Sequence, residues 1–250
     1  MDHAAALTEQ NGLLADLYRT ADPEVDVPSC PGWTLRKLVT HVGRGDRWAA
    51  TIVRERSDAY VDIRTVTGGR PPDDQDGVAE WLRAGAAELL AAVATVGPDV
   101  PVWTFTGPKP AGWWIRRRLH EATVHRADGT LALGVDYELA AELAADGVSE
   151  WLDLLAARPV RDRPAPLDAG MTLHLHATDN GLGSAGEWLM RGEADGLSWE
   201  HGHAKGELAV RGRAVDLLLA LLRRIPADDA RLQVLGDAEM WRSLLGRTGF

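Results

Sequence analysis

The residues best suited to chemistry lie in one short segment, His120-Glu-Ala-Thr-Val-His125. Glu121 and His125 are four residues apart, so on a helix their side chains project from one face about one turn apart. A carboxylate and an imidazole placed in this way can bind one metal ion. His120 points elsewhere, about 100° around the helix from Glu121 and about 140° from His125. The segment therefore differs from the metalloprotease motif H-E-x-x-H, which needs two histidines four residues apart.

A third ligand has to come from another part of the chain, and His41 is the best candidate. In a helix it follows the same face as Leu35 and Leu38, which is the apolar, inward face. In a helix bundle that face can lie opposite Glu121 and His125. Two histidines, one carboxylate and an open position make up a catalytic zinc centre. Spacing alone also allows these histidines to be hydrogen-bonded core residues without a metal.

Hydrophobic periodicity predicts the elements that would position these residues. Five helices are expected first, at about residues 4–20, 35–54, 78–96, 111–128 and 137–157. After residue 166 the pattern alternates, which predicts strands at 171–177, 197–199, 207–211 and 231–235. Two more helices are expected at 214–224 and 238–245. The sequence therefore predicts helices in the first part of the chain and strands after residue 166.

This change of pattern predicts two domains of different class. Residues 1–158 are expected to form an all-helical domain, and residues 167–250 a smaller α+β domain. Between them, Arg161–Pro166 contains two prolines and several charged residues and is expected to be a linker.

The overall composition excludes several classes of protein. With 37 Asp and Glu against 27 Lys and Arg, the net charge is −10, which argues against non-specific binding to nucleic acid or anionic membranes. No apolar run approaches the length of a transmembrane helix, and no signal peptide is visible, so we expect a cytoplasmic protein. The single cysteine, Cys30, excludes an intramolecular disulfide and is expected to be structural.

Several segments together match the signatures of a known family. The first is Val27–Gly43, VPSCPGWTLRKLVTHVG, followed by Trp48, and the second is Trp113–Asp128, WWIRRRLHEATVHRAD. Further similar segments lie in the second half of the chain, at Leu175–Asp179, Gly186–Trp188, Gly202–Ala204 and Val210–Leu219. In this order and over nearly the whole chain, the sequence resembles the mycothiol-dependent maleylpyruvate isomerase family.

The resemblance implies a fold and a metal site. The fold would be a DinB-like four-helix bundle followed by a smaller, sterol-carrier-like α+β domain. The family's metal ligands would fall on His41, Glu121 and His125, the three residues that helical spacing also selects. Zn²⁺ suits these nitrogen and oxygen ligands, although nickel, cobalt or iron would also bind them.

The resemblance also implies mycothiol, a low-molecular-weight thiol of actinobacteria, as cosubstrate. A metal ion deprotonates a coordinating thiol, which is otherwise mostly protonated at neutral pH. In an isomerase, the thiolate would add to the double bond of a cis-enedioyl acid such as maleylpyruvate. Rotation and expulsion of the thiol would then give the trans product. Two alternatives remain: a mycothiol S-transferase acting on another electrophile, and a non-catalytic ligand-binding regulator, which would have no need of all three ligands.

Arginines and tryptophans are the remaining predicted site residues. An anionic substrate needs local arginines, because a guanidinium binds a carboxylate through two parallel hydrogen bonds. This catalytic role could fall to one of the run Arg116–Arg118 or to Arg211 or Arg213 at a strand end, and of these Arg117 and Arg211 are the named candidates. Trp33 and Trp114 lie in the signature segments and are predicted to line the mycothiol pocket. The expected partners are mycothiol and a small electrophilic substrate, in a monomer or small homo-oligomer.

Two pairs of histidines alternate along the second half of the chain. They are His174 with His176 and His201 with His203. Such pairs could hold a second metal ion, but the sequence shows no carboxylate in register with them. We therefore expect these histidines to be structural or solvent-facing.

Overall fold

The computed structural model describes residues 1–158 and 164–248 of the chain. The chain divides into two compact units, Asp2–Tyr137 and Glu138–Phe250, which are described separately. The first three residues of the predicted linker Arg161–Pro166 lie outside the described residues. Within the described residues, no helix is long and apolar enough to cross a membrane.

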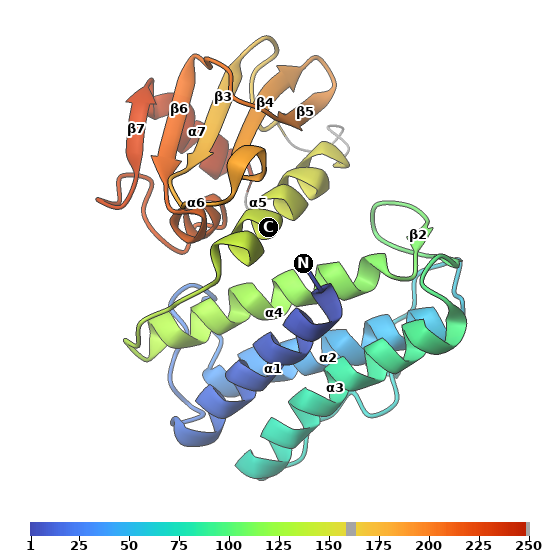
Figure 1. Cartoon of the computed structure of the whole chain (residues 1–250). Coiled ribbons are helices and arrows are strands. Elements are labelled where there is room, and N and C mark those ends of the chain that lie inside the picture. The colour runs from blue at the N-terminus through green and yellow to red at the C-terminus, as the bar shows by residue number, and fades with distance from the viewer. Residues whose placement is uncertain (159–163, 249–250) are drawn as a thin grey trace. The chain divides into compact units, whose positions relative to one another are not determined.

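Four long helices build the first unit (Figure 1). They are α1 (His3–Thr20), α2 (Leu35–Arg54), α3 (Gln75–Val96) and α4 (Trp113–Ala132). Both α1 and α2 pack against α3 and α4. The core between the helices contains fully buried leucines such as Leu14, Leu38, Leu89 and Leu119. This bundle sets the metal-ligand candidates of α2 opposite those of α4. The connection between α3 and α4 carries a two-stranded hairpin of β1 (Pro101–Val102) and β2 (Lys109–Pro110).

A buried ion pair joins α2 to α4 close to these candidates. Arg118 Nε donates to Asp46 Oδ1 at 2.8 Å, and Arg118 Nη2 donates to the Val42 carbonyl at 2.9 Å. Gly45 makes room for the guanidinium, because a Cβ at this position would lie 2.6 Å from Arg118 Cζ. The Asp46 side chain is fully buried, and burial raises its pKa although Arg118 opposes the shift. The pair therefore fixes α4 against α2 only one turn from Glu121.

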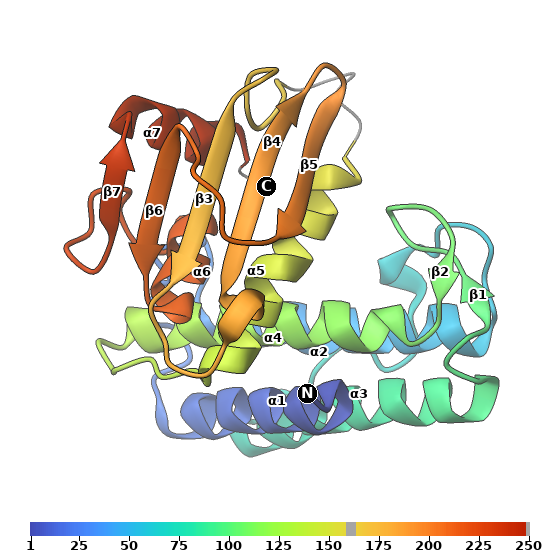
Figure 2. The same ribbon diagram turned by 45° about the horizontal axis from the view of Figure 1, so that its top comes forward.

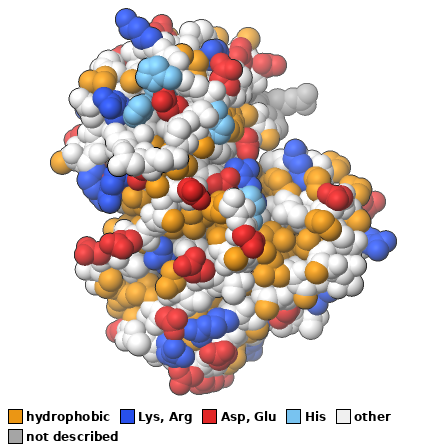
Figure 3. Space-filling view, viewed as in Figure 1, with side chains coloured by type: hydrophobic (Ala, Val, Ile, Leu, Met, Phe, Trp, Pro, Cys, Tyr) orange, Lys and Arg blue, Asp and Glu red, His pale blue; other side chains and the backbone are white. Residues whose placement is uncertain are grey.

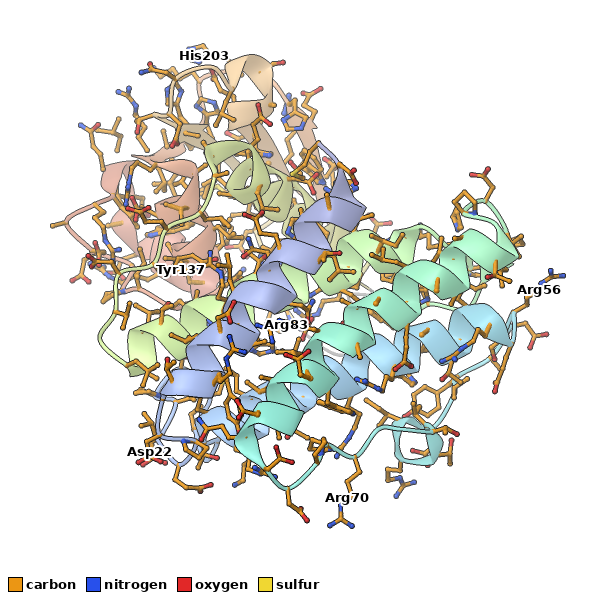
Figure 4. All side chains as sticks on the ribbon, turned by 60° about the horizontal axis from the view of Figure 1, so that its bottom comes forward. Asp22, Arg56, Arg70, Arg83, Tyr137 and His203 are labelled. Atoms are coloured by element: carbon orange, nitrogen blue, oxygen red, sulfur yellow. The ribbon has the colours of Figure 1, made fainter. Side chains whose placement is uncertain are left out.

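An exposed ion pair offers a contrast on the other side of the bundle. Arg83 on α3 donates to Asp16 on α1 at 2.7 Å, between helices that lie side by side in Figure 4. Because both groups keep access to water, such a pair contributes about 1 kcal/mol or less.

The second unit is a five-stranded sheet with three helices. The strands are β3 (Thr172–Ala177), β4 (Glu187–Glu193), β5 (Gly196–His201), β6 (Leu208–Gly212) and β7 (Gln233–Gly236). Their order is β5-β4-β3-β6-β7, with β3 and β6 parallel and the other neighbours antiparallel. The helices are α5 (Ala141–Ala156), α6 (Ala214–Leu221) and α7 (Ala238–Arg247).

The three helices cover one face of the sheet (Figure 2). On β3, Leu173 and Leu175 are fully buried, and on β4 the buried Trp188 donates from its indole to Ser149 Oγ of α5 at 2.9 Å. Since side chains alternate along a strand, His174 and His176 occupy the opposite face. The sheet therefore has an apolar face under the helices and a face that carries histidines.

The structure confirms the predicted fold class and changes two details. The chain is a four-helix bundle followed by an α+β unit, as expected. However, α5 packs on α6 and β5 in the second unit, whereas the sequence analysis placed it in a helical domain ending at residue 158. The strand Glu187–Glu193 was not predicted at all.

Candidate metal centre

The structure brings His41, Glu121 and His125 together. His41 projects from α2, while Glu121 and His125 project from consecutive turns of α4. Glu121 Oε1 lies 3.2 Å from His41 Nε2 and 3.4 Å from His125 Nε2. Around a tetrahedral zinc ion with bonds of about 2.0–2.1 Å, neighbouring ligand atoms are about 3.3 Å apart. The donor set and its spacing therefore fit a divalent metal ion.

The first signature segment forms a turn that presents Trp33 to the two imidazoles. The backbone N–H of Val27 donates to the Trp33 carbonyl, and that of Leu35 donates to the Val25 carbonyl, both at 2.9 Å. Gly32 takes a φ of +80°, which other residues adopt only at a cost. The Trp33 ring centroid lies 4.9 Å from that of His41 and 6.0 Å from that of His125. Trp33, a predicted mycothiol-binding residue, thus covers one side of the cluster.

Asp128 is a residue of the site that the sequence analysis missed. Its fully buried carboxylate lies 2.9 Å from His125 Nδ1, and it accepts hydrogen bonds from Ser29 Oγ at 2.6 Å and Cys30 Sγ at 3.5 Å. With Nδ1 engaged in this way, Nε2 of His125 is directed toward Glu121. Metal-binding histidines are commonly oriented by a carboxylate on the second ring nitrogen. Asp128 follows His125 by three residues, which on a helix places the two side chains on one face, and this spacing could have revealed the pair from the sequence.

The electrostatics of the cluster follow from burial and from its ion pairs. Burial works to raise the pKa of Glu121, but Arg117 and the two histidines outweigh it and hold this pKa well below its usual range. Burial lowers the pKa of His41. For His125, burial is outweighed by hydrogen bonds with Asp128, Cys30 and Glu121, which raise its pKa to about 10. At neutral pH Glu121 is therefore ionised and His41 neutral, which are the forms that bind metal ions, whereas His125 carries a second proton that a bound metal ion would displace.

Arg117 lies in the cluster, but its partner is a predicted metal ligand. Its guanidinium pairs with Glu121 Oε2, one turn further along α4, and its side chain is only 12% exposed. The neighbouring Arg118 is occupied by Asp46 in the core. Arg117 thus has the larger effect on the pKa of Glu121, and the charge of Arg118 adds to it.

Two other predicted site residues lie outside this cluster. Trp114 is buried among aromatic rings, with Trp48 at 5.1 Å and Trp113 at 5.0 Å between centroids, and its indole donates to the Trp103 carbonyl. Its side chain is almost fully buried in the hydrophobic core, and its role in lining the mycothiol pocket stays a prediction. Arg211 is exposed on β6 of the second unit, where it lines a cavity of about 390 Å³ with neighbours that include Arg213 and Arg231.

Comparison with known families identifies the chain. Residues 3–128 match the model of the mycothiol maleylpyruvate isomerase N-terminal domain, and residues 142–243 match that of the MDMPI C-terminal domain. The chain belongs to the mycothiol maleylpyruvate isomerase family. This membership confirms the resemblance seen in the signature segments and the prediction of an enzyme of this kind. The second family model also includes nearly all of α5, in agreement with the division of the structure.

Solved structures support the fold. A crystal structure of the mycothiol-dependent maleylpyruvate isomerase shares 15% sequence identity, with a TM-score of 0.61 over 93% of this chain and 91% of that chain. A variant of that enzyme with one histidine replaced by alanine matches with the same identity and coverage and a TM-score of 0.59. No curated protein matches the chain significantly. At this identity, the likeness shows that the two chains share a fold.

Proposed function

We propose that this chain is a metal- and mycothiol-dependent enzyme that isomerises a maleylpyruvate-like cis-enedioyl acid. The observation that carries the proposal is the convergence of two imidazole nitrogens on one carboxylate oxygen, at 3.2 and 3.4 Å, in a member of this family. A divalent metal ion, for which zinc is the best fit, would bind to His41, Glu121 and His125 and would lower the pKa of a thiol at its open position.

The surrounding residues have distinct roles in this proposal. Asp128 keeps a proton on Nδ1 of His125, so that Nε2 faces Glu121 and would bind a metal ion through its lone pair once its own proton is displaced. Trp33 packs against the two imidazoles and helps to hold them in place. Arg117 balances the charge of Glu121 and adds a positive field that favours an anionic substrate. Trp114 supports the start of α4 from the core through its packing.

For the carboxylate of the substrate, Arg211 remains our candidate in the second domain. It is exposed and lines a cavity with Arg213, whereas Arg213 itself is paired with Asp216 at 2.9 Å. A guanidinium with a solvent-facing position can form bidentate contacts with an incoming carboxylate. We further propose a cytoplasmic enzyme whose partners are mycothiol and a small electrophilic acid, working as a monomer or small homo-oligomer.

The reaction can be tested by following both the mass and the configuration of the product. Metal-loaded enzyme is incubated with mycothiol and maleylpyruvate. Conversion from cis to trans at unchanged mass, dependent on mycothiol, is the expected result. A stable thiol adduct would identify an S-transferase instead. If neither product forms with mycothiol, as for a ligand-binding regulator, the proposed activity is wrong.

Asp128 provides a test of the support around the centre. Replacing it with asparagine removes the charge that orients His125, so we expect metal affinity to fall by about 10- to 100-fold. Competition with a chromophoric chelator measures this change. Ser29→Ala is the matched control, since it removes only one hydrogen bond to Asp128 and leaves its carboxylate in place. Equal affinity in Asp128→Asn and the unmodified protein would show that Asp128 does not support metal binding.

A further inference from the structure

A second cluster of metal-binding side chains lies in the α+β unit. His174 and His176 come from β3, Glu187 begins β4, and His203 lies in the segment between β5 and β6. Glu187 Oε2 is 3.0 Å from His174 Nε2, 3.5 Å from His176 Nδ1 and 2.6 Å from His203 Nδ1. Three imidazole nitrogens thus converge on one carboxylate oxygen.

The sheet explains why these residues meet. His174 and His176 are two residues apart and share a face, and Glu187 is the direct cross-strand neighbour of His176. Directly opposed residues of antiparallel strands project to the same face. The expectation that no carboxylate lies in register with the histidines was wrong, because the carboxylate comes from β4, which the sequence analysis did not predict.

We propose that His174, His176, Glu187 and His203 bind a second divalent transition-metal ion of the zinc class. The ligand atoms of all four residues lie within 4.8 Å of one another. Their distances from Glu187 Oε2 bracket the edge of about 3.3 Å expected for a tetrahedral zinc site. Three histidines and one carboxylate fill four positions. The site is therefore of the closed, structural type, unlike the three-ligand centre in the bundle.

The charges of the cluster favour a cation at its centre. The three imidazole rings lie 5.3 to 6.2 Å apart between centroids, so protonation of all three would place like charges close together around one carboxylate. Neutral rings, in contrast, direct lone pairs toward a common point when their other nitrogens carry the proton. A divalent ion at this point satisfies the lone pairs and the carboxylate together.

The exposure of the four ligands indicates what the ion would do. The side chains of His174, His176 and Glu187 are 6%, 25% and 19% exposed, whereas that of His203 is 76% exposed. Figure 3 shows histidine side chains beside an acidic one over the sheet, and Figure 4 labels His203 at the edge of the molecule. Three ligands are thus held by the sheet and one by the β5–β6 segment. Metal binding would fasten this segment to β3 and β4.

Zinc stoichiometry of the full-length chain tests the inference. After removal of metal by a chelator, each variant is dialysed against Zn²⁺ and its zinc content is measured by elemental analysis. We expect two zinc ions per chain in the unmodified protein. Glu187→Gln and His203→Ala should each lose one equivalent, whereas His201→Ala should lose none. His201 is the matched control because its Nδ1 lies 3.0 Å from the backbone oxygen of Glu187, and the residue is not one of the four clustered ligands. Far-UV circular dichroism confirms that each variant is folded.

Glu121→Gln separates this inference from the proposed function. If this variant keeps one zinc ion per chain and the added His203→Ala change removes it, the second site is supported. If Glu121→Gln alone leaves no bound zinc, or if its remaining zinc survives both Glu187→Gln and His203→Ala, the second site does not exist. If Glu187→Gln and His203→Ala lower the zinc content but Glu121→Gln does not, the proposed metal centre in the helix bundle is contradicted.

Discussion

Replacement of Glu121 by glutamine is expected to remove one equivalent of metal per chain and, with it, the mycothiol-dependent activity. Glu121 Oε1 is the atom on which His41 and His125 converge, and it supplies the only carboxylate among these three residues. An amide oxygen carries no charge to offset a divalent ion. Removing a residue that only hydrogen-bonds to a metal ligand lowers activity by about 10- to 100-fold. Removing the ligand Glu121 itself should lower it further. Metal content and the rate of cis-to-trans conversion measure the effect.

The matched control for this change is Glu80→Gln. Glu80 lies on α3, its side chain is 68% exposed, and it pairs with Arg83 at 2.8 Å on the surface. This variant should retain the metal content and rate of the unmodified protein. If Glu121→Gln behaves like Glu80→Gln, the cluster on α2 and α4 does not hold the catalytic metal.

Replacement of Arg118 by methionine is expected to destabilise the chain by about 3–5 kcal/mol. The variant leaves Asp46 as an uncompensated carboxylate in the core, where its side chain has no exposure to water. It also removes the tie between α4 and the Val42 carbonyl of α2. Urea unfolding measures the change. Arg83→Ala, which breaks the exposed pair with Asp16, should cost about 1 kcal/mol or less.

The pH dependence of Arg118→Met distinguishes loss of charge pairing from loss of packing. Burial already raises the pKa of Asp46, and removal of Arg118 raises it further. A carboxyl group with a raised pKa binds its proton more tightly in the folded than in the unfolded chain. The difference in stability from the unmodified protein should therefore shrink as the pH falls through the pKa of folded Asp46. A difference that stays constant with pH would show that lost packing causes the effect.

Much of the fold could be predicted from local pattern, and what was missed depends on contacts between distant residues. The helices α1, α2 and α3 have apolar faces, so periodicity located them to within a few residues. The strand Glu187–Glu193 was missed because its central residues, Trp188–Met190, form an apolar run without alternation. The helix α5 was located well, but its periodicity does not say which core it joins. Packing on α6 and β5 decides that.

The same distinction applies to the site. Helical spacing placed Glu121 with His125, and the inward face of the second helix suggested His41. Asp128 was missed although it lies three residues after His125 on the same helix, and its other partner Ser29 is 99 residues away in the sequence. Arg117 could be named as a charge near the site, but its pairing with Glu121 depends on the rotamers that both side chains adopt. Helical spacing therefore selected the three candidate ligands, whereas the pairings of their neighbours Arg117 and Asp128 came from the structure.

A titration of cobalt-substituted enzyme with mycothiol, followed by absorption spectroscopy, shows whether the proposed metal ion binds the thiol. If His41, Glu121 and His125 hold a metal ion that binds the thiol as a thiolate, we expect an absorption band characteristic of sulfur bound to cobalt. This band should saturate at one thiol per chain and be absent from Glu121→Gln. A titration with no such band, or one in which Glu121→Gln gives the same band, would contradict this proposal.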